Sequence, residues 1–103
     1  MTEHAATLEI TNPTGLHARP AVKLTKLAKT FADASVQVAL AEGGPWIDAK
    51  SVVKVMAMKA ARGASLHVRA TGAQAAEALA ALAALVRRDF DEGHADMDKN
   101  VQA

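Results

Sequence analysis

Residues 7–31 read TLEITNPTGLHARPAVKLTKLAKTF, and they contain the change of pattern that decides the fold. In residues 7–11 apolar and polar side chains alternate, which predicts a half-buried strand. The run at 12–15, NPTG, breaks that pattern. From about Ala18 the apolar side chains recur with a helical period, and Pro20 lies in the first turn, where its missing N–H costs nothing. The stretch therefore predicts a strand, a loop and an amphipathic helix in succession.

The middle of the chain continues with two strands and a short helix. Residues 35–40 alternate like a second strand, and the turn at 42–45 leads into a short third strand over 46–48. Residues 51–59 contain valines that favour a strand, but their spacing is helical. Because Ser51 is also a good N-cap, a short helix is predicted there.

The last part of the chain adds one strand and one long helix. Residues 64–70 alternate between apolar and polar side chains, and residues 73–90 form an alanine-rich helix with a leucine face. The polar end, residues 94–103, is expected to be frayed, beyond a single domain with a core of about residues 5–93. The resulting order is βαββαβα. Strands with one polar face and helices with one apolar stripe predict an α+β fold, with an antiparallel sheet covered by helices on one side only.

Composition excludes several classes of protein. The chain has 103 residues, of which 25 are alanine and only three are aromatic, so the core is expected to be thin. The absence of cysteine excludes disulfides, thiolate metal sites and thiol nucleophiles. Since no histidine pair has metal-ligand spacing, no metal site is expected. No signal peptide and no apolar run of about 18 residues are found, so a cytoplasmic protein without membrane insertion is expected.

The net charge of +1 hides an uneven distribution, because residues 1–72 carry +4 and residues 73–103 carry −3. A total near zero argues against a general nucleic-acid binder. A small α/β RNA-binding domain is also disfavoured, because the strands lack exposed aromatics for base stacking. Trp46 is interpreted as a packing residue over the hairpin. Two further histidines, His4 and His94, are expected in the tails, and His67 is expected to face outward from its strand.

The segment at residues 14–20, TGLHARP, carries the chemistry. His17 lies just before the first turn of a helix, where backbone N–H groups have no helical partner and the dipole stabilises an anion. A cation is disfavoured there, so a neutral, nucleophilic imidazole is expected. Arg19 adds a positive fork suited to phosphate oxygens, and Gly15 permits a close approach. These residues indicate a histidine that accepts a phosphoryl group, with a capping or surface histidine as the alternative.

Three segments of the chain resemble the HPr family, the histidine-containing phosphocarriers of the bacterial phosphoenolpyruvate:sugar phosphotransferase system. Residues 14–20 resemble the active-site signature of that family. Residues 48–56, DAKSVVKVM, resemble the signature around its regulatory serine, and residues 85–93, LVRRDFDEG, resemble the end of its last helix. The resemblance implies an open-faced β-sandwich, in which three helices cover one face of a four-stranded antiparallel sheet.

The resemblance also implies a function for the histidine. His17 would accept a phosphoryl group on Nδ1 from phospho-Enzyme I and pass it to an Enzyme IIA-type or IIB-type protein, or to a dihydroxyacetone-kinase relay. Arg19 and the backbone N–H groups of Ala18 and Arg19 would stabilise the phosphoryl group, and Thr14 matches a position where a small polar side chain assists. The protein would be a monomeric stoichiometric carrier without a cofactor, rather than a stand-alone enzyme.

Ser51 matches the serine that an ATP-dependent HPr kinase/phosphorylase modifies in many relatives, and its other interpretation is a simple helix N-cap. The alternative function is therefore a regulatory interaction module that acts through phosphorylated Ser51, although intact His17 and Arg19 count against it. Partners are expected to dock on an apolar patch ringed by lysines, for which core packing and an ordinary solvated face are the alternatives. The residues of this expected docking surface are Lys23, Lys26, Lys50, Val52, Val53, Lys54 and Met56.

Overall fold

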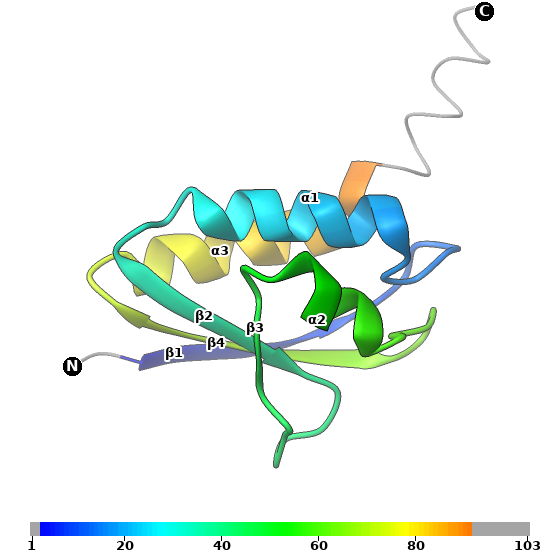
Figure 1. Cartoon of the computed structure of the whole chain (residues 1–103), viewed down its shortest axis with the longest axis horizontal. Coiled ribbons are helices and arrows are strands. Elements are labelled where there is room, and N and C mark those ends of the chain that lie inside the picture. The colour runs from blue at the N-terminus through cyan, green and yellow to red at the C-terminus, as the bar shows by residue number, and fades with distance from the viewer. Residues whose placement is uncertain (1–2, 92–103) are drawn as a thin grey trace, which may run out of the picture.

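The four strands pair in the order β1-β4-β2-β3 to form one antiparallel sheet in the computed structural model, which describes residues 3–91. Helices α1, α2 and α3 all lie on one side of this sheet, and its other side is left open (Figure 1). Along the chain the elements are β1 Glu3–Glu9, α1 Ala18–Lys29, β2 Ala34–Ala39, β3 Ile47–Asp48, α2 Val52–Ala57, β4 Ser65–Gly72, α3 Ala75–Arg87 and a 3-10 turn, η1, Asp89–Asp91.

Alternation within the strands sorts the side chains between the two faces of the sheet. Leu8 of β1 lies opposite Leu66 of β4, and Val38 of β2 lies opposite Val68 of β4. All four side chains are buried and face the helices. Apart from Ala5 and Ala39, the intervening positions carry polar residues, so the same alternation leaves the opposite face of the sheet largely polar.

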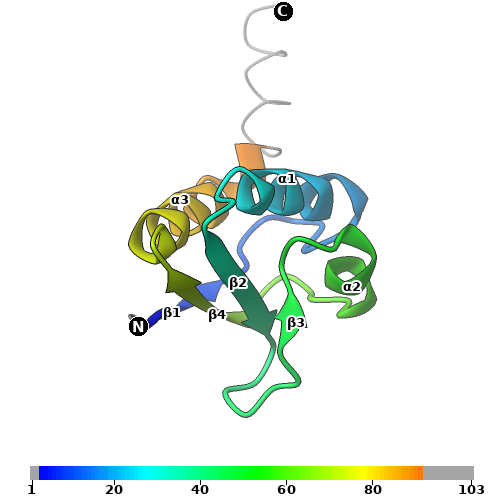
Figure 2. The same cartoon turned by 60° about the vertical axis from the view of Figure 1, so that its left-hand side comes forward.

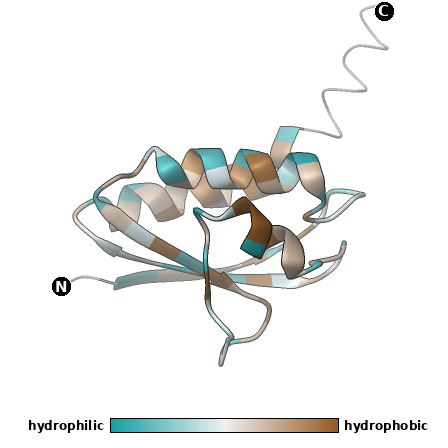
Figure 3. Cartoon of the chain, in the orientation of Figure 1, coloured by the Kyte–Doolittle hydropathy of each residue, from teal (hydrophilic) through white to brown (hydrophobic). Residues whose placement is uncertain are grey.

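Helices α1 and α3 lie side by side above the sheet, while α2 lies next to α1 over the β3 side (Figures 1 and 2). From α1, Leu24 and Ala28 are fully buried in the interface with the sheet. From α3, the buried residues include Ala78 and Leu82. Alanines at these positions allow the helix backbones to approach closely, so the core is thin but continuous. Figure 3 shows that apolar residues also colour much of α2, where they extend to its exposed side.

The expected sheet, with helices on one face only, is confirmed, and the segment at residues 51–59 is a helix rather than a strand. The first strand was predicted too late and too short: it spans Glu3–Glu9 instead of residues 7–11. His4 is therefore not in a tail, because it pairs with Ala70 inside the sheet. Strand β4 supplies backbone partners for β1 as far as Thr71, which pairs with Glu3, and these partners extend β1 toward its start.

The last helix was predicted to run to residue 90, but α3 ends at Arg87. Asp89, Phe90 and Asp91 all have positive φ angles, and these reverse the local backbone handedness. That reversal turns Phe90 into the core, where it is fully buried. The expected frayed tail, residues 94–103 with His94, lies outside the described residues.

Within residues 3–91, no helix is both long and apolar enough to cross a membrane. In the same part of the chain, no three or more histidine, aspartate or glutamate side chains lie close enough together to hold a metal ion.

Candidate functional site

His17 is the N-cap of α1, with an extended backbone at φ −79° and ψ −166° and an exposed side chain that does not cap the helix. The first helical hydrogen bond runs from the Ala21 N–H to the His17 carbonyl at 2.9 Å. Pro20 has no N–H, so Ala18 and Arg19 supply the backbone donors of the first turn beyond the cap. These donors lie at the positive end of the helix dipole, beside the histidine, where an anion is stabilised.

Gly15 fixes how closely the loop before His17 approaches the segment that follows α2. Its φ is +66°, and a Cβ added there would overlap the carbonyl oxygen of Ala60. The same carbonyl accepts a 2.9 Å hydrogen bond from the N–H of Leu16. Glycine is required at this position for both its left-handed backbone and the contact. The sequence-based expectation of a close approach at Gly15 thus corresponds to a contact within the chain.

Asn12 holds the loop from the inside. Its side chain is fully buried, and its Nδ2 donates to the Gly15 carbonyl at 2.7 Å and to Thr14 Oγ1 at 3.3 Å. Its Oδ1 has no hydrogen-bond partner among the described residues. Thr14 is exposed, and its hydroxyl accepts the bond from Asn12 Nδ2 and donates to the Gly15 carbonyl at 3.4 Å. From the sequence, Asn12 was identified only as part of the break at residues 12–15. An asparagine directly before proline and three residues before glycine is, however, a signal for a turn that its side chain stabilises.

A shallow depression of about 240 Å³ lies beside His17. Its walls are formed by the loop before α1, by the C-terminal end of α2 and by the residues that follow α2. Lys59 in this wall has a left-handed φ of 55°, and the sequence pattern did not identify it as a neighbour of the histidine. The residues that line the depression are Thr14, Leu16, His17, Met56, Lys59, Ala60 and Ala61.

Helix α2 presents the second predicted segment beside this depression. Ser51 is its N-cap and is half-buried, and its Oγ accepts the Lys54 N–H at 3.4 Å. Val53 is 73% exposed and Met56 is 37% exposed, whereas Val52 is half-buried. Val53 and Met56 thus give α2 an exposed apolar patch, the kind of feature that a docking surface requires, and Met56 also lines the depression beside His17.

The lysines expected around this patch differ in their contacts. Lys26 and Lys54 are exposed. Lys50 Nζ donates to the carbonyl oxygens of Phe31 and Ala34, at 3.0 and 2.7 Å. Lys23 Nζ donates to the carbonyl oxygen of Phe90 at 2.8 Å, so it joins α1 to η1. Two of the four lysines thus also hold segments of the fold together.

Comparison with known proteins adds independent evidence. Residues 5–88 match the family described as "PTS HPr component phosphorylation site". The chain is 46% identical over 86 residues to phosphocarrier protein NPr of Escherichia coli (strain K12), covering 84% of this chain and 93% of the relative. It is 40% identical over 84 residues to phosphocarrier protein HPr of Cupriavidus necator, covering 82% and 91%.

A solved structure agrees with these sequence matches. HPr-C-His from Thermoanaerobacter tengcongensis superposes with a TM-score of 0.78 at 34% identity, covering 89% of this chain and 98% of that one. The family match extends over both α1 with its N-cap histidine and α2 with its N-cap serine. The chain therefore belongs to the HPr family of phosphotransferase-system phosphocarrier proteins.

Proposed function

We propose that the protein accepts a phosphoryl group on Nδ1 of His17 from phospho-Enzyme I and passes it to an Enzyme IIA-type or dihydroxyacetone-kinase-type acceptor in the cytoplasm. The observation that carries the proposal is the position of His17 as the exposed N-cap residue of α1, whose side chain makes no capping hydrogen bond to the helix. The protein acts as a stoichiometric carrier, since it keeps the group only until an acceptor docks.

The transfer needs only positioning and charge stabilisation. The lone pair on neutral Nδ1 attacks phosphorus in line with the donor's bond, which breaks with its electron pair returning to the donor. The Ala18 and Arg19 N–H groups and the Arg19 guanidinium stabilise the charge on the phosphoryl oxygens. Delivery is the same step in reverse, with the acceptor nucleophile attacking phosphorus and Nδ1 of His17 leaving with the electron pair.

Partners dock on the patch formed by Val53 and Met56 with the exposed lysines Lys26 and Lys54. Met56 also lines the depression beside His17, so the patch and the reacting atom share one side of the molecule. A small apolar centre with a basic rim favours acidic partners that bind briefly. One monomer is sufficient for this role.

Ser51 is the second modification site in this proposal, and an ATP-dependent HPr kinase/phosphorylase is the enzyme that would act on it. Its side chain lies at the start of α2, and in sequence it precedes Val53 by two residues and Met56 by five. A phosphate there adds nearly two negative charges next to the docking patch, which weakens binding to acidic partners.

The decisive experiment is incubation of the chain with phosphoenolpyruvate and Enzyme I. One acid-labile, alkali-stable phosphate per chain is expected, and His17→Ala abolishes it. His67→Gln is the matched control, because this half-buried histidine lies on the sheet, and it retains the label. Label on His17→Ala would overturn the assignment.

The regulatory part is tested separately with the cognate kinase and ATP. An acid-stable phosphate is expected on the wild-type chain and not on Ser51→Asn, which keeps an N-cap side chain but has no hydroxyl. An unlabelled wild-type chain in the presence of active kinase removes the regulatory claim and leaves the carrier function intact.

A further inference from the structure

The face of the sheet opposite the helices carries a second hollow, which the phosphocarrier site does not use. Strands β1 and β4 contribute Thr7 and His67 to this open face, and the Thr7 Oγ1 and His67 Nδ1 atoms form a 3.0 Å hydrogen bond across the two strands. The loop between β2 and β3 projects away from the helices on this side (Figures 1 and 2). It brings Trp46 over the strands.

Trp46 is held in place by Arg69. The guanidinium carbon of Arg69 lies 4.1 Å from the centroid of the indole ring, and its Nε donates to Gln37 Oε1 at 2.8 Å. Gly44, with a φ of +93°, allows the loop to turn tightly, because an added Cβ would lie only 2.9 Å from the backbone nitrogen of Trp46. One side of the indole is thus occupied by a cation, as expected of a residue that packs over the hairpin.

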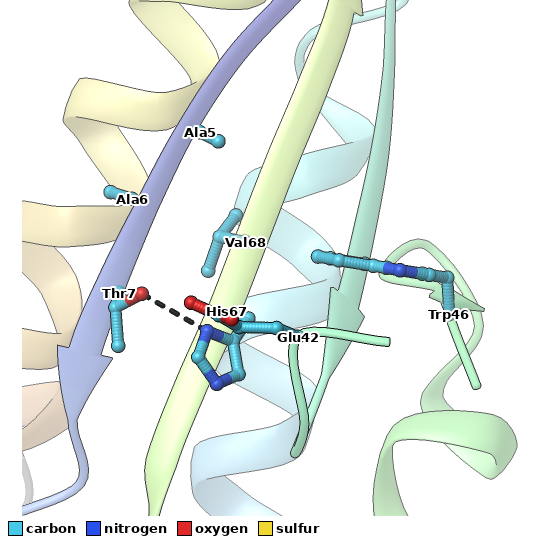
Figure 4. A pocket seen from close by; sticks show the side chains of 7 residues that line it. All are labelled: Ala5, Ala6, Thr7, Glu42, Trp46, His67 and Val68. Carbon is cyan, nitrogen blue, oxygen red and sulfur yellow. Dashed lines mark hydrogen bonds between the residues drawn. The ribbon is translucent and has the colours of Figure 1, made fainter. Parts of the chain in front are cut away.

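The other side of the indole borders a pocket of about 250 Å³. Figure 4 shows the Trp46 ring on edge, with Glu42 reaching across β4 toward His67 below it. Arg69 does not line this pocket. The residues that β1 contributes to its lining, Ala5, Ala6 and Thr7, have small side chains. The lining residues are Ala5, Ala6, Thr7, Glu42, Trp46, His67 and Val68.

Charge indicates what this pocket accepts. Within residues 3–91, the Glu42 carboxylate makes no hydrogen bond or ion pair. Alternation also places the exposed Glu3, Glu9 and Asp48 on this face, where Arg69 is the cation that already stacks on the ring. The open face is therefore acidic, opposite in sign to the lysine-bearing surface of α1 and α2. A nucleic acid or an acidic protein would be repelled here.

We propose that this pocket is a docking site for a basic protein segment and that it receives one arginine side chain. The incoming guanidinium stacks on the free face of Trp46, as Arg69 does on the other face, and pairs with the carboxylate of Glu42. Arginine fits better than lysine because a planar guanidinium stacks on an indole and pairs with a carboxylate at the same time. The site lies on the opposite side of the sheet from α1 and α2, so it is filled without blocking His17.

The test uses Trp46 itself, since it is the only tryptophan in the chain and its fluorescence reports on the pocket. The probe is the blocked peptide acetyl-Gly-Arg-Gly-Arg-Gly-amide, titrated into the full chain. A saturable fluorescence change is expected, and Glu42→Gln weakens the apparent affinity by about threefold or more, as expected for loss of an exposed ion pair. Lys26→Gln, on the helical side, leaves the titration unchanged.

A second peptide tests whether binding requires the positive charge of the arginine side chain. Citrulline in place of arginine keeps the shape and removes the charge, so it is expected to bind at least threefold more weakly. Equal binding of the citrulline peptide, an unchanged affinity in Glu42→Gln, or no saturable change with the arginine peptide would each overturn the proposal. Phosphoryl uptake from Enzyme I by Glu42→Gln is expected to equal that of wild type, which verifies that the variant is folded.

Discussion

The side-chain amide of Asn12 donates a 2.7 Å hydrogen bond to the carbonyl oxygen of Gly15, two residues before His17. The amide is fully buried, and its own oxygen has no partner among the described residues. A buried acceptor without a partner costs stability. The hydrogen bond to Gly15 helps to fix the conformation of the loop. Through it, the buried Asn12 side chain influences the position of the reactive histidine.

Asn12→Leu is expected to slow phosphoryl uptake more than it changes stability. The substitution keeps a similar volume and removes the unsatisfied oxygen, so the free energy of unfolding in urea should change by less than about 2 kcal/mol. Without the hydrogen bond the loop is less ordered, and the initial rate of labelling by Enzyme I should fall by about tenfold. Thr25→Val is the control, because Thr25 Oγ1 is also buried without a partner, but lies inside α1. Equal rates for both variants would contradict this role of Asn12.

Gly15→Ala is expected to destabilise the protein more than Gly63→Ala. Both glycines have a positive φ, so both substitutions carry backbone strain of about 1–2 kcal/mol. Only at Gly15 does the new Cβ meet a neighbour, the Ala60 carbonyl, whereas nothing lies within 4 Å at Gly63. The steric overlap should add about 1–3 kcal/mol to the loss in unfolding free energy at Gly15. Equal losses in urea denaturation would show that the overlap is relieved without cost.

Much of the fold was predictable from local patterns. The helical spacing that begins near Ala18, with Pro20 in the first turn, marks the start of α1 to the residue. The alternation of Leu66 and Val68 with polar neighbours identifies β4. Such signals are local, because each depends on residues within a few positions of one another.

The features that the sequence did not reveal depend on distant partners. Ala5 and Ala6 give no contrast in polarity, so the early part of β1 is defined only by its pairing with β4. The burial of Phe90 requires three successive positive φ angles, which aspartate and phenylalanine do not signal. In the site, the motif identified His17 as the N-cap residue, but the burial of Asn12 follows from the packing of the whole loop.

Lys50→Met is expected to lower the unfolding free energy by about 1.5–3 kcal/mol. The Lys50 ammonium donates to two backbone carbonyls, that of Phe31 in the connection after α1 and that of Ala34, the first residue of β2. Removal of the ammonium leaves both charge-assisted hydrogen bonds unmade. Lys54→Met is the matched control, since Lys54 is exposed and its loss should change stability by less than about 0.5 kcal/mol. Identical unfolding midpoints for the two variants would show that the Lys50 bonds do not stabilise the fold.

Val53→Ser is expected to weaken partner docking without unfolding the protein. Val53 is 73% exposed on α2, so it gains burial only when a partner covers it. Loss of about 1 kcal/mol of apolar contact should raise the KM for this protein in phosphoryl uptake from Enzyme I by about fivefold, with kcat unchanged. Val55→Ser is the contrasting variant, because Val55 is fully buried on the same helix and a hydroxyl there lowers the unfolding free energy. An unchanged KM for Val53→Ser would place the docking surface elsewhere, while a fall in kcat alone would mean that α2 acts on the chemical step rather than on binding.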